Sequence, residues 1–104
     1  MSPNTNYIRG RSFEYVRMKH WREVMKCTVM RTAGSHGMAD LIVITPKGQV
    51  IFIQCKVTKD PKEAKRLLAG FKKFPPLPLL QTRTFQQAME VKVVGSTEVF
   101  DVYV

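Results

Sequence analysis

The sequence predicts an α/β protein, a mixed β-sheet flanked by helices in the order αβββαβ and followed by a β-rich end. Three observations predict this fold class. Two segments carry apolar residues at helical spacing, several short segments have the apolar pattern of strands, and turn signals separate the neighbouring strands. With 104 residues, of which 44% are hydrophobic, residues 1–104 are expected to form a single domain around one core.

The first helix is predicted over residues 12–25, after a flexible N-terminal segment of residues 1–8. Apolar residues recur in this helix at helical spacing, while charged residues such as Arg17 fall on its other faces. His20 lies beside Trp21 on the apolar face, which favours a histidine at the edge of the core over a metal ligand. Five residues are expected to share the face that packs on the core: Phe13, Val16, His20, Trp21 and Val24.

Three strands are predicted next, with connections that suit antiparallel neighbours. They cover residues 27–32, 40–45 and 50–57. A small, polar stretch with two glycines at 32–37 predicts a loop, and the Pro-Lys-Gly sequence at 46–48 predicts a tight turn. Together these features predict a β-meander.

The second helix is predicted from the residues at its N-terminus. Asp60 is suited to the N-cap, Pro61 to the first helical position, and Glu63 to completing a capping box. Two prolines at 75–76 end the helix. Four residues at helical spacing form its apolar face: Ala64, Leu67, Leu68 and Phe71.

The last part of the chain is predicted to form short strands. Residues 77–84 are expected to form one strand after the proline pair. Residues 89–94 and 99–104 are expected to form two more, separated by the turn signal Gly95-Ser96. This end of the chain therefore adds strands to the sheet that the meander begins.

The charge of the chain favours a polyanionic partner. There are 17 Lys and Arg residues against 8 Asp and Glu residues, which gives a formal net charge of +9. Each Lys or Arg set against a phosphate releases counterions and adds salt-sensitive affinity, so nucleic acid is the leading candidate. Basicity that serves solubility alone is the alternative that charge by itself leaves open.

The chain carries no sequence signal for a membrane or for export. Its apolar runs are far shorter than the roughly 20 residues needed to cross a bilayer. The first 15 residues contain no apolar signal segment, and Cys27 and Cys55 have neither disulfide-framework nor zinc-ligand spacing. An intracellular, cytoplasmic location is therefore expected.

Asp40, Gln54 and Lys56 form the pattern that points to chemistry. Gln54 and Lys56 share one face of a predicted strand, because residues two apart on a strand point the same way. If this strand pairs with the one that Asp40 opens, Asp40 stands beside Gln54, and their oxygens suit a hard divalent cation. Lys56 can then orient a water or stabilise charge on a phosphate. A solvated strand face is the alternative interpretation.

Three segments of the sequence, in this order and at this spacing, resemble a known nuclease family. They are RGRSFEYV at residues 9–16, RTAGSHGMADLIV at residues 31–43 and FIQCK at residues 52–56. These motifs resemble those of the archaeal-type Holliday junction resolvases and their phage relatives, a branch of the PD-(D/E)XK nuclease superfamily. The resemblance covers about residues 9–75. It implies a restriction-endonuclease-like αβββαβ core.

The resemblance also implies a role for each matching residue. Glu14 matches the helix glutamate that assists metal binding, and Asp40 matches the metal-bridging aspartate. Gln54 matches the second acidic position of the metal site, and Lys56 matches the catalytic lysine. The implied metal is Mg²⁺, for which Mn²⁺ can substitute. Two positions match residues that the family places near the scissile phosphate: Arg31 and Ser35.

Two positions depart from the family's pattern. Ala39 stands where the motif usually has Pro, a change that affects only backbone shape. Gln54 stands where many members have Glu, which removes one negative charge from the metal site. Because a phage subgroup has the same Gln-Cys-Lys string, activity is expected to persist. Metal binding is expected to be weaker, which makes Glu14 more important.

Basic residues around the motifs are expected to contact DNA. Arg9, Arg11 and Arg31 are expected to grip the phosphate backbone. His36 is a candidate phosphate contact or proton shuttle, and turn chemistry is the alternative for both Ser35 and His36. A basic run begins before the second helix and continues along it, as a phosphate-binding surface or a solvated helix face: Lys59, Lys62, Lys65, Arg66, Lys72 and Lys73.

The expected function is that of a Mg²⁺-dependent endonuclease that resolves four-way DNA junctions by paired symmetric nicks. A junction presents two scissile strands related by a twofold axis, so a homodimer is expected. No membrane and no small-molecule cofactor are expected. The apolar helix face around Leu67, Leu68 and Phe71, together with residues 74–80, is a candidate for either the dimer surface or the core.

Three alternative functions stay open at this stage. A nuclease of the same superfamily could act on another branched or nicked DNA. A non-catalytic module could bind junctions without cleaving them. A basic RNA-binding protein is the third alternative, and the lack of clustered aromatic residues counts against it.

Overall fold

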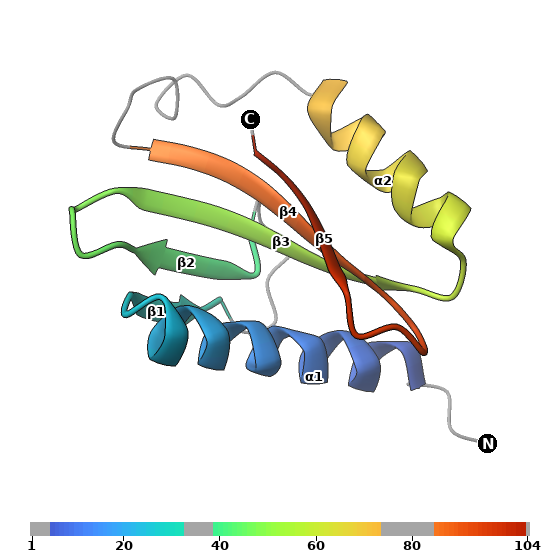
Figure 1. The fold of residues 1–104 in the computed structure, drawn as a ribbon, viewed down its shortest axis with the longest axis horizontal. Coiled ribbons are helices and arrows are strands. Elements are labelled where there is room, and N and C mark those ends of the chain that lie inside the picture. Colours follow the sequence, from blue (N-terminus) through green and yellow to red (C-terminus); the bar gives the residue numbers. More distant parts are fainter. Residues whose placement is uncertain (1–4, 33–38, 74–84, 104) are drawn as a thin grey trace.

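The computed structural model describes residues 5–32, 39–73 and 85–103 (Figure 1). The first helix, α1, passes into a short π-helical segment, and α2 separates the first three strands from the last two. The elements follow in this order: α1 (Thr5–Lys19), the π-helix His20–Val24, β1 (Thr28–Arg31), β2 (Leu41–Ile44), β3 (Val50–Thr58), α2 (Pro61–Lys73), β4 (Phe85–Val93) and β5 (Val99–Tyr103).

The five strands form one mixed sheet in the order β1-β2-β3-β4-β5. The first three strands are antiparallel neighbours, which confirms the predicted meander. In the β2–β3 turn, the Gly48 amide donates to the Thr45 carbonyl at 2.9 Å, and its φ of +88° is a conformation that glycine adopts without strain. β4 lies parallel to β3, because α2 carries the chain back across the sheet, and β5 returns antiparallel to β4. The predicted α/β class with a mixed sheet is therefore confirmed.

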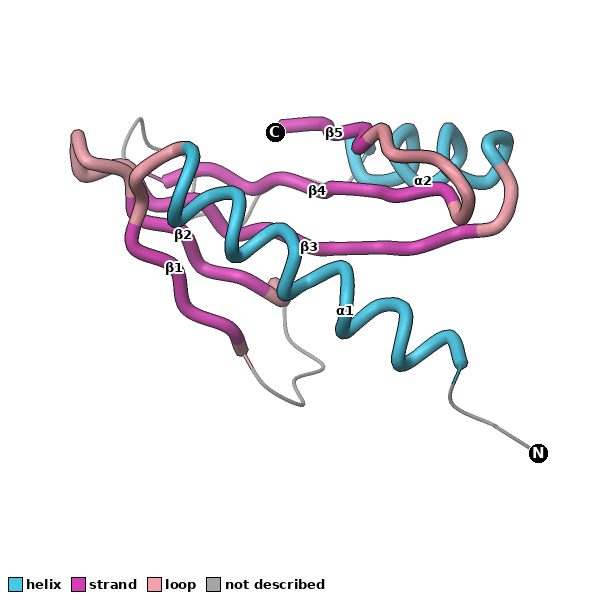
Figure 2. The backbone as a smooth tube through the Cα atoms, turned by 60° about the horizontal axis from the view of Figure 1, so that its bottom comes forward, coloured by secondary structure: helices cyan, strands magenta, loops and turns pink. Residues whose placement is uncertain are grey.

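The two helices cover opposite faces of this sheet (Figures 1 and 2). On one face, Phe13 and Trp21 pack with residues of β2 and β3, including the fully buried Leu41 and Ile53. On the other face, α2 packs against alternate residues of β4 and against β5. α2 lies mainly over β4 and β5. The face of β3 that carries Gln54 and Lys56 is therefore at the edge of the area that α2 covers.

The first helix differs from its prediction in extent and in its buried face. It begins at Thr5, so residues 5–8, expected in a flexible segment, belong to α1. Phe13 and Trp21 are buried as predicted, but Val16 and Val24 are 59% and 64% exposed. The reason is that Arg17, midway between Phe13 and Trp21 on the helix surface, turns inward to pair with Glu90 of β4.

The N-terminus of α2 uses a different capping arrangement from the predicted box. The Asp60 carboxylate accepts a hydrogen bond from the Lys62 amide at 2.9 Å, as an N-cap residue does. Glu63 does not reach back to the Asp60 amide. Instead, the buried Thr58 hydroxyl donates to Glu63 at 2.9 Å and accepts from the Asp60 amide at 3.2 Å. The last residue of β3 thus links strand and helix.

The apolar face of α2 packs against the sheet. Leu67, Leu68 and Phe71 are partly buried and contact the cluster formed by β4, β5 and Ala64, as the core alternative for this face expects. The segment 74–80, its companion in the dimer hypothesis, lies outside the described residues. Among the described residues, no helix is long and apolar enough to cross a membrane.

The first of the two C-terminal strands, β4, extends further at its N-terminal end than predicted. β4 begins at Phe85, four residues before the predicted start, and β5 covers Val99–Tyr103. The predicted strand at 77–84 lies outside the described residues. Alternation along β4 divides its side chains between the two faces, with Ala88 in the α1 core and Met89 in the α2 core.

Candidate functional site

Asp40 is anchored at the point where the chain enters β2. Its amide donates to the Ile53 carbonyl at 2.8 Å, and its own carbonyl accepts from the Thr32 amide at 2.9 Å. Its carboxylate oxygen Oδ2 accepts a hydrogen bond from the Cys55 amide at 2.9 Å. The paired part of β2 begins at Leu41, opposite Ile53, so Asp40 lies just before it, and the expected pairing of Asp40 with Gln54 is not among the paired positions of the described strands.

Glu14 of α1 is brought to the same region by Arg31, the last residue of β1. Arg31 Nε donates to Glu14 Oε1 at 3.0 Å, and the two side chains are only 15% and 16% exposed. Burial and the nearby Asp40 carboxylate raise the pKa of Glu14, while the hydrogen bond and charge of Arg31 lower it. Two carboxylates and one guanidinium from three parts of the chain therefore meet here.

The pKa of Glu14 gives a testable consequence of this arrangement. Without divalent cations, Arg31→Gln is expected to raise that pKa further, and Asp40→Asn to lower it, because the variants remove opposing causes. Since the pKa is raised on folding, Glu14 contributes stability that is present at low pH and lost as the pH rises through its folded-state pKa. A ¹³C NMR titration of the Glu14 carboxyl measures both shifts. A lower pKa in Arg31→Gln would contradict the proposed geometry.

Gln54 and Lys56 share one face of β3, as the alternation predicted. Gln54 is partly exposed and Lys56 is exposed. Ile53, which precedes Gln54, and Cys55, which lies between the two, are buried on the α1 face. Within the described part of the chain, the side chains of Gln54 and Lys56 make no hydrogen bond or ion pair to each other or to Asp40. Gln54 and Lys56 therefore project from β3 on the face opposite to Ile53 and Cys55.

Cys55 is a packing residue, in agreement with its predicted direction. It is 7% exposed within the α1 core, and both cysteines of the protein are free thiols. Burial, followed by the negative charges of Glu90, Asp40 and Glu14, raises the pKa of the Cys55 thiol. A neutral thiol at this position is a poor nucleophile.

Tyr15 is a residue of this region that the sequence interpretation missed. The Cζ atoms of Arg11 and Arg31 lie 5.8 and 5.1 Å from the centroid of its ring, and the residue is 49% exposed. A hydrogen bond from Arg11 and the charges of both arginines lower the pKa of Tyr15. The spacing of Arg11 and Tyr15, four residues apart on a helix, was the available sequence signal.

A second missed feature is a buried ion pair between α1 and β4. The Arg17 guanidinium donates to both carboxylate oxygens of the fully buried Glu90, at 2.9 and 2.8 Å. The Trp21 indole N–H donates to Glu90 Oε2 at 3.2 Å. Because Arg17 lies one helical turn from Glu14, this pair holds the part of α1 that carries Glu14 against the sheet.

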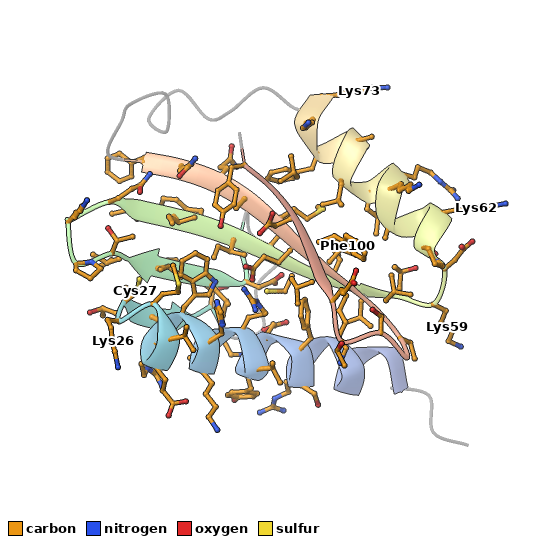
Figure 3. The ribbon with its side chains drawn as sticks, viewed as in Figure 1. Lys26, Cys27, Lys59, Lys62, Lys73 and Phe100 are labelled. Atoms are coloured by element: carbon orange, nitrogen blue, oxygen red, sulfur yellow. The ribbon has the colours of Figure 1, made fainter. Side chains whose placement is uncertain are left out.

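The remaining predicted site residues fall elsewhere. Ser35 and His36 lie outside the described residues, and Arg9 lies in α1 with a side chain outside them. Lys59 and Lys62 project from the β3–α2 connection and the first turn of α2 (Figure 3). The whole basic run at and along α2 is exposed. These lysines therefore extend the basic surface and do not join the carboxylate cluster.

The donor set at Asp40 fits a hard divalent cation. Among the described residues, no group of three His, Cys, Asp or Glu side chains is placed to hold a metal ion. The two carboxylates that lie within electrostatic reach of each other are Asp40 and Glu14, while the amide of Gln54 projects from the other face of β3. Oxygen donors of this kind suit Mg²⁺, which keeps several waters and needs only one or two protein carboxylates.

The two carboxylates and the Arg31 guanidinium are groups that metal-assisted chemistry on a phosphate can use. That conclusion rests on the sequence motifs and on the geometry of the site. In comparisons with protein-family models, curated proteins and solved structures, no match to this chain was found.

Proposed function

We propose that the protein is a metal-dependent, structure-selective DNA endonuclease that cleaves four-way junctions by paired symmetric nicks. The single observation that carries the proposal is the anchoring of Asp40. Its carboxylate is fixed to the β3 backbone at Cys55 and lies within electrostatic reach of Glu14. Gln54 and Lys56 lie on either side of Cys55 in β3 and share one face of that strand.

The proposed metal ligands are Asp40, Glu14 and Gln54, with Mg²⁺ as the physiological ion and Mn²⁺ as a substitute. The bound ion supplies the Lewis-acid chemistry that phosphodiester hydrolysis requires. Asp40 is held in one orientation by the Cys55 amide, so its position does not have to be organised when substrate binds. Lys56 orients the attacking water or stabilises negative charge that develops on the phosphate.

Arg31 has two partners in this mechanism. Before substrate binds, it pairs with Glu14 and compensates the negative charge of the carboxylate cluster. Neutralisation of the same carboxylates by a bound ion would leave the Arg31 guanidinium available to the phosphate backbone of the DNA, which a guanidinium can bind with two parallel hydrogen bonds. This exchange keeps a partly buried guanidinium paired in both states.

The fold and the charge of the chain support the same proposal. The element order helix, three antiparallel strands, helix and parallel strand is the order that a restriction-endonuclease-like core requires, and we assign the fold to that class as part of the proposal. The net charge of +9 favours a polyanionic substrate. Exposed lysines on α2, together with Arg11 and Arg31, supply the phosphate contacts.

A homodimer follows from the proposed substrate, because a single site on one chain reaches only one of the two scissile strands. The apolar face of α2 packs against β4 and β5 but stays partly exposed, so it remains a candidate for part of the dimer surface. Sedimentation of the purified protein with and without a junction measures its oligomeric state.

A substrate comparison tests the proposed function. Labelled four-way junction, flap, nicked duplex and linear duplex of matched sequence are incubated with the protein and Mg²⁺. Symmetric nicks in the junction alone support a junction resolvase, whereas preferred cleavage of flaps or nicked duplex indicates a related endonuclease. Tight junction binding without any product, with or without Mg²⁺, indicates a non-catalytic binding module.

Gln54→Glu is expected to strengthen metal binding, because the variant restores a negative charge to the donor set. The Mg²⁺ concentration that gives half-maximal cleavage should fall by about threefold to tenfold, while the folded state is retained because Gln54 is partly exposed. Cleavage measured over a Mg²⁺ series tests this, with Gln49→Glu in the β2–β3 turn as the control. Loss of activity through unfolding would show that residue 54 does not face an open site.

A further inference from the structure

Arg11, Tyr15 and Arg31 form a cluster, the arginine–tyrosine cluster, beside the proposed catalytic centre. Arg11 and Tyr15 come from α1, and Arg31 comes from the end of β1. Both guanidinium carbons lie within 6 Å of the ring centroid of Tyr15, at 5.8 and 5.1 Å. The tyrosine is nevertheless 49% exposed, so solvent and ligands can reach the cluster.

The cluster brings two positive charges to one aromatic ring. Attraction between each guanidinium and the electrons of the ring offsets part of the repulsion between the two cations. Glu14 neutralises Arg31 through a single hydrogen bond from Nε, which uses one of the five N–H donors of that guanidinium. Arg11, Arg31 and Glu14 together carry a formal charge of +1, and Arg11 is exposed.

We infer that the arginine–tyrosine cluster is a binding subsite for a phosphodiester group that neighbours the one being cleaved. This inference rests on the proposed DNA substrate and deepens it. Guanidinium groups bind phosphate oxygens through paired, charge-assisted hydrogen bonds, and two of them facing one anion need a fixed spacing. The ring of Tyr15 supplies that spacing, which makes Tyr15 a positioning residue.

Phosphate is favoured over a nucleobase as the group bound here. A base needs an open aromatic face for stacking, whereas the Tyr15 ring is approached by a guanidinium from its own helix and by another from β1. A phosphate needs positive charge and N–H donors, and the cluster presents both. Since Arg31 contacts both Glu14 and the Tyr15 ring, a strand held at this subsite passes the carboxylate cluster.

Equilibrium binding in EDTA tests the subsite apart from cleavage. Tyr15→Leu is expected to weaken binding of a four-way junction by about fivefold to tenfold and to reduce the salt slope by about one, the loss of one phosphate contact. Tyr15→Phe keeps the ring and is expected to stay within about twofold of the wild type. Tyr103→Leu, a change of another exposed tyrosine on β5, is the matched control and should leave affinity unchanged.

A double-mutant cycle distinguishes a Tyr15 that positions the arginines from a Tyr15 that contacts the phosphate itself. If Tyr15 acts through the arginines, Arg11→Gln and Tyr15→Leu together should cost less affinity than the product of the two single losses. Full additivity would overturn the positioning role. Because Tyr15 is half exposed, the melting temperature should stay within about 3 °C of the wild type, so lost affinity cannot be ascribed to unfolding.

A titration with inorganic pyrophosphate distinguishes failure of the subsite from failure of the proposed function. The Nε–Hε NMR resonances of Arg11 and Arg31 are expected to shift in the wild type and to shift much less in Tyr15→Leu. Such shifts support the subsite even if the protein cleaves no DNA. Unchanged arginine resonances, or wild-type junction affinity in Tyr15→Leu, would overturn the inference while leaving the nuclease proposal standing.

Discussion

Asp40→Asn is expected to abolish junction cleavage, with a loss of rate on the order of 1,000-fold, while junction affinity stays within about tenfold of the wild type. The asparagine can still accept the hydrogen bond from the Cys55 amide, so the backbone at β2 and β3 is preserved. What the variant removes is the negative charge of a proposed metal ligand. Single-turnover cleavage and equilibrium binding of the same labelled junction measure the two quantities.

Lys56→Ala is likewise expected to abolish junction cleavage while junction affinity stays within about tenfold of the wild type. Lys56 is exposed on β3 and acts on the attacking water or the phosphate charge, so its loss changes the reaction more than the binding. Asp101→Asn on β5 and Lys47→Ala in the β2–β3 turn are matched, exposed controls with unchanged rates expected. Affinity losses as large as the rate losses would show that Asp40 and Lys56 have structural roles instead.

Glu90→Leu is expected to lower the free energy of unfolding by about 3–5 kcal/mol, the largest effect on stability in the protein. The variant leaves the Arg17 guanidinium, only 12% exposed, without the carboxylate that accepts two of its hydrogen bonds. It also removes the acceptor of the Trp21 indole N–H. Urea unfolding followed by the fluorescence of Trp21, the one tryptophan of the chain, measures the change.

The double variant Arg17→Met with Glu90→Leu is the control for this effect. Replacing both members of a buried ion pair by apolar residues removes the unpaired charge, so much of the lost stability should return. A cost equal to the sum of the two single variants would contradict the description of Arg17 and Glu90 as a coupled buried pair. A cost below about 1 kcal/mol for Glu90→Leu alone would contradict its burial.

The features that the sequence predicted best are those set by neighbouring residues. Turn chemistry at residues 46–48 and the alternation along β3 are local, and together they fix the register that pairs Leu41 with Ile53. The N-terminus of α2 was located by Asp60 and Pro61 for the same reason. The opposite directions of Cys55 and Lys56 follow from the two-residue period of a strand.

The features that the sequence did not predict depend on contacts between distant segments. Arg17 was assigned to a solvent-facing side of its helix because its partner, Glu90, lies 73 residues away. That pairing also explains why Val16 is exposed although it fits an apolar face. Tyr15 acquires its second arginine only when β1 folds against α1. Local periodicity contains none of these contacts.

Metal-dependent cleavage of a four-way junction is the most direct test of the central claim, that Asp40, Glu14 and Gln54 hold a catalytic divalent cation. A junction labelled on each strand in turn is incubated with the wild type in Mg²⁺, Mn²⁺ or EDTA, beside linear duplex of the same sequence. The account predicts paired, symmetric nicks in the junction with either metal ion, none in EDTA, and none with Asp40→Asn. Nicks that persist in EDTA or in Asp40→Asn, or a junction left intact under all three conditions, would contradict it.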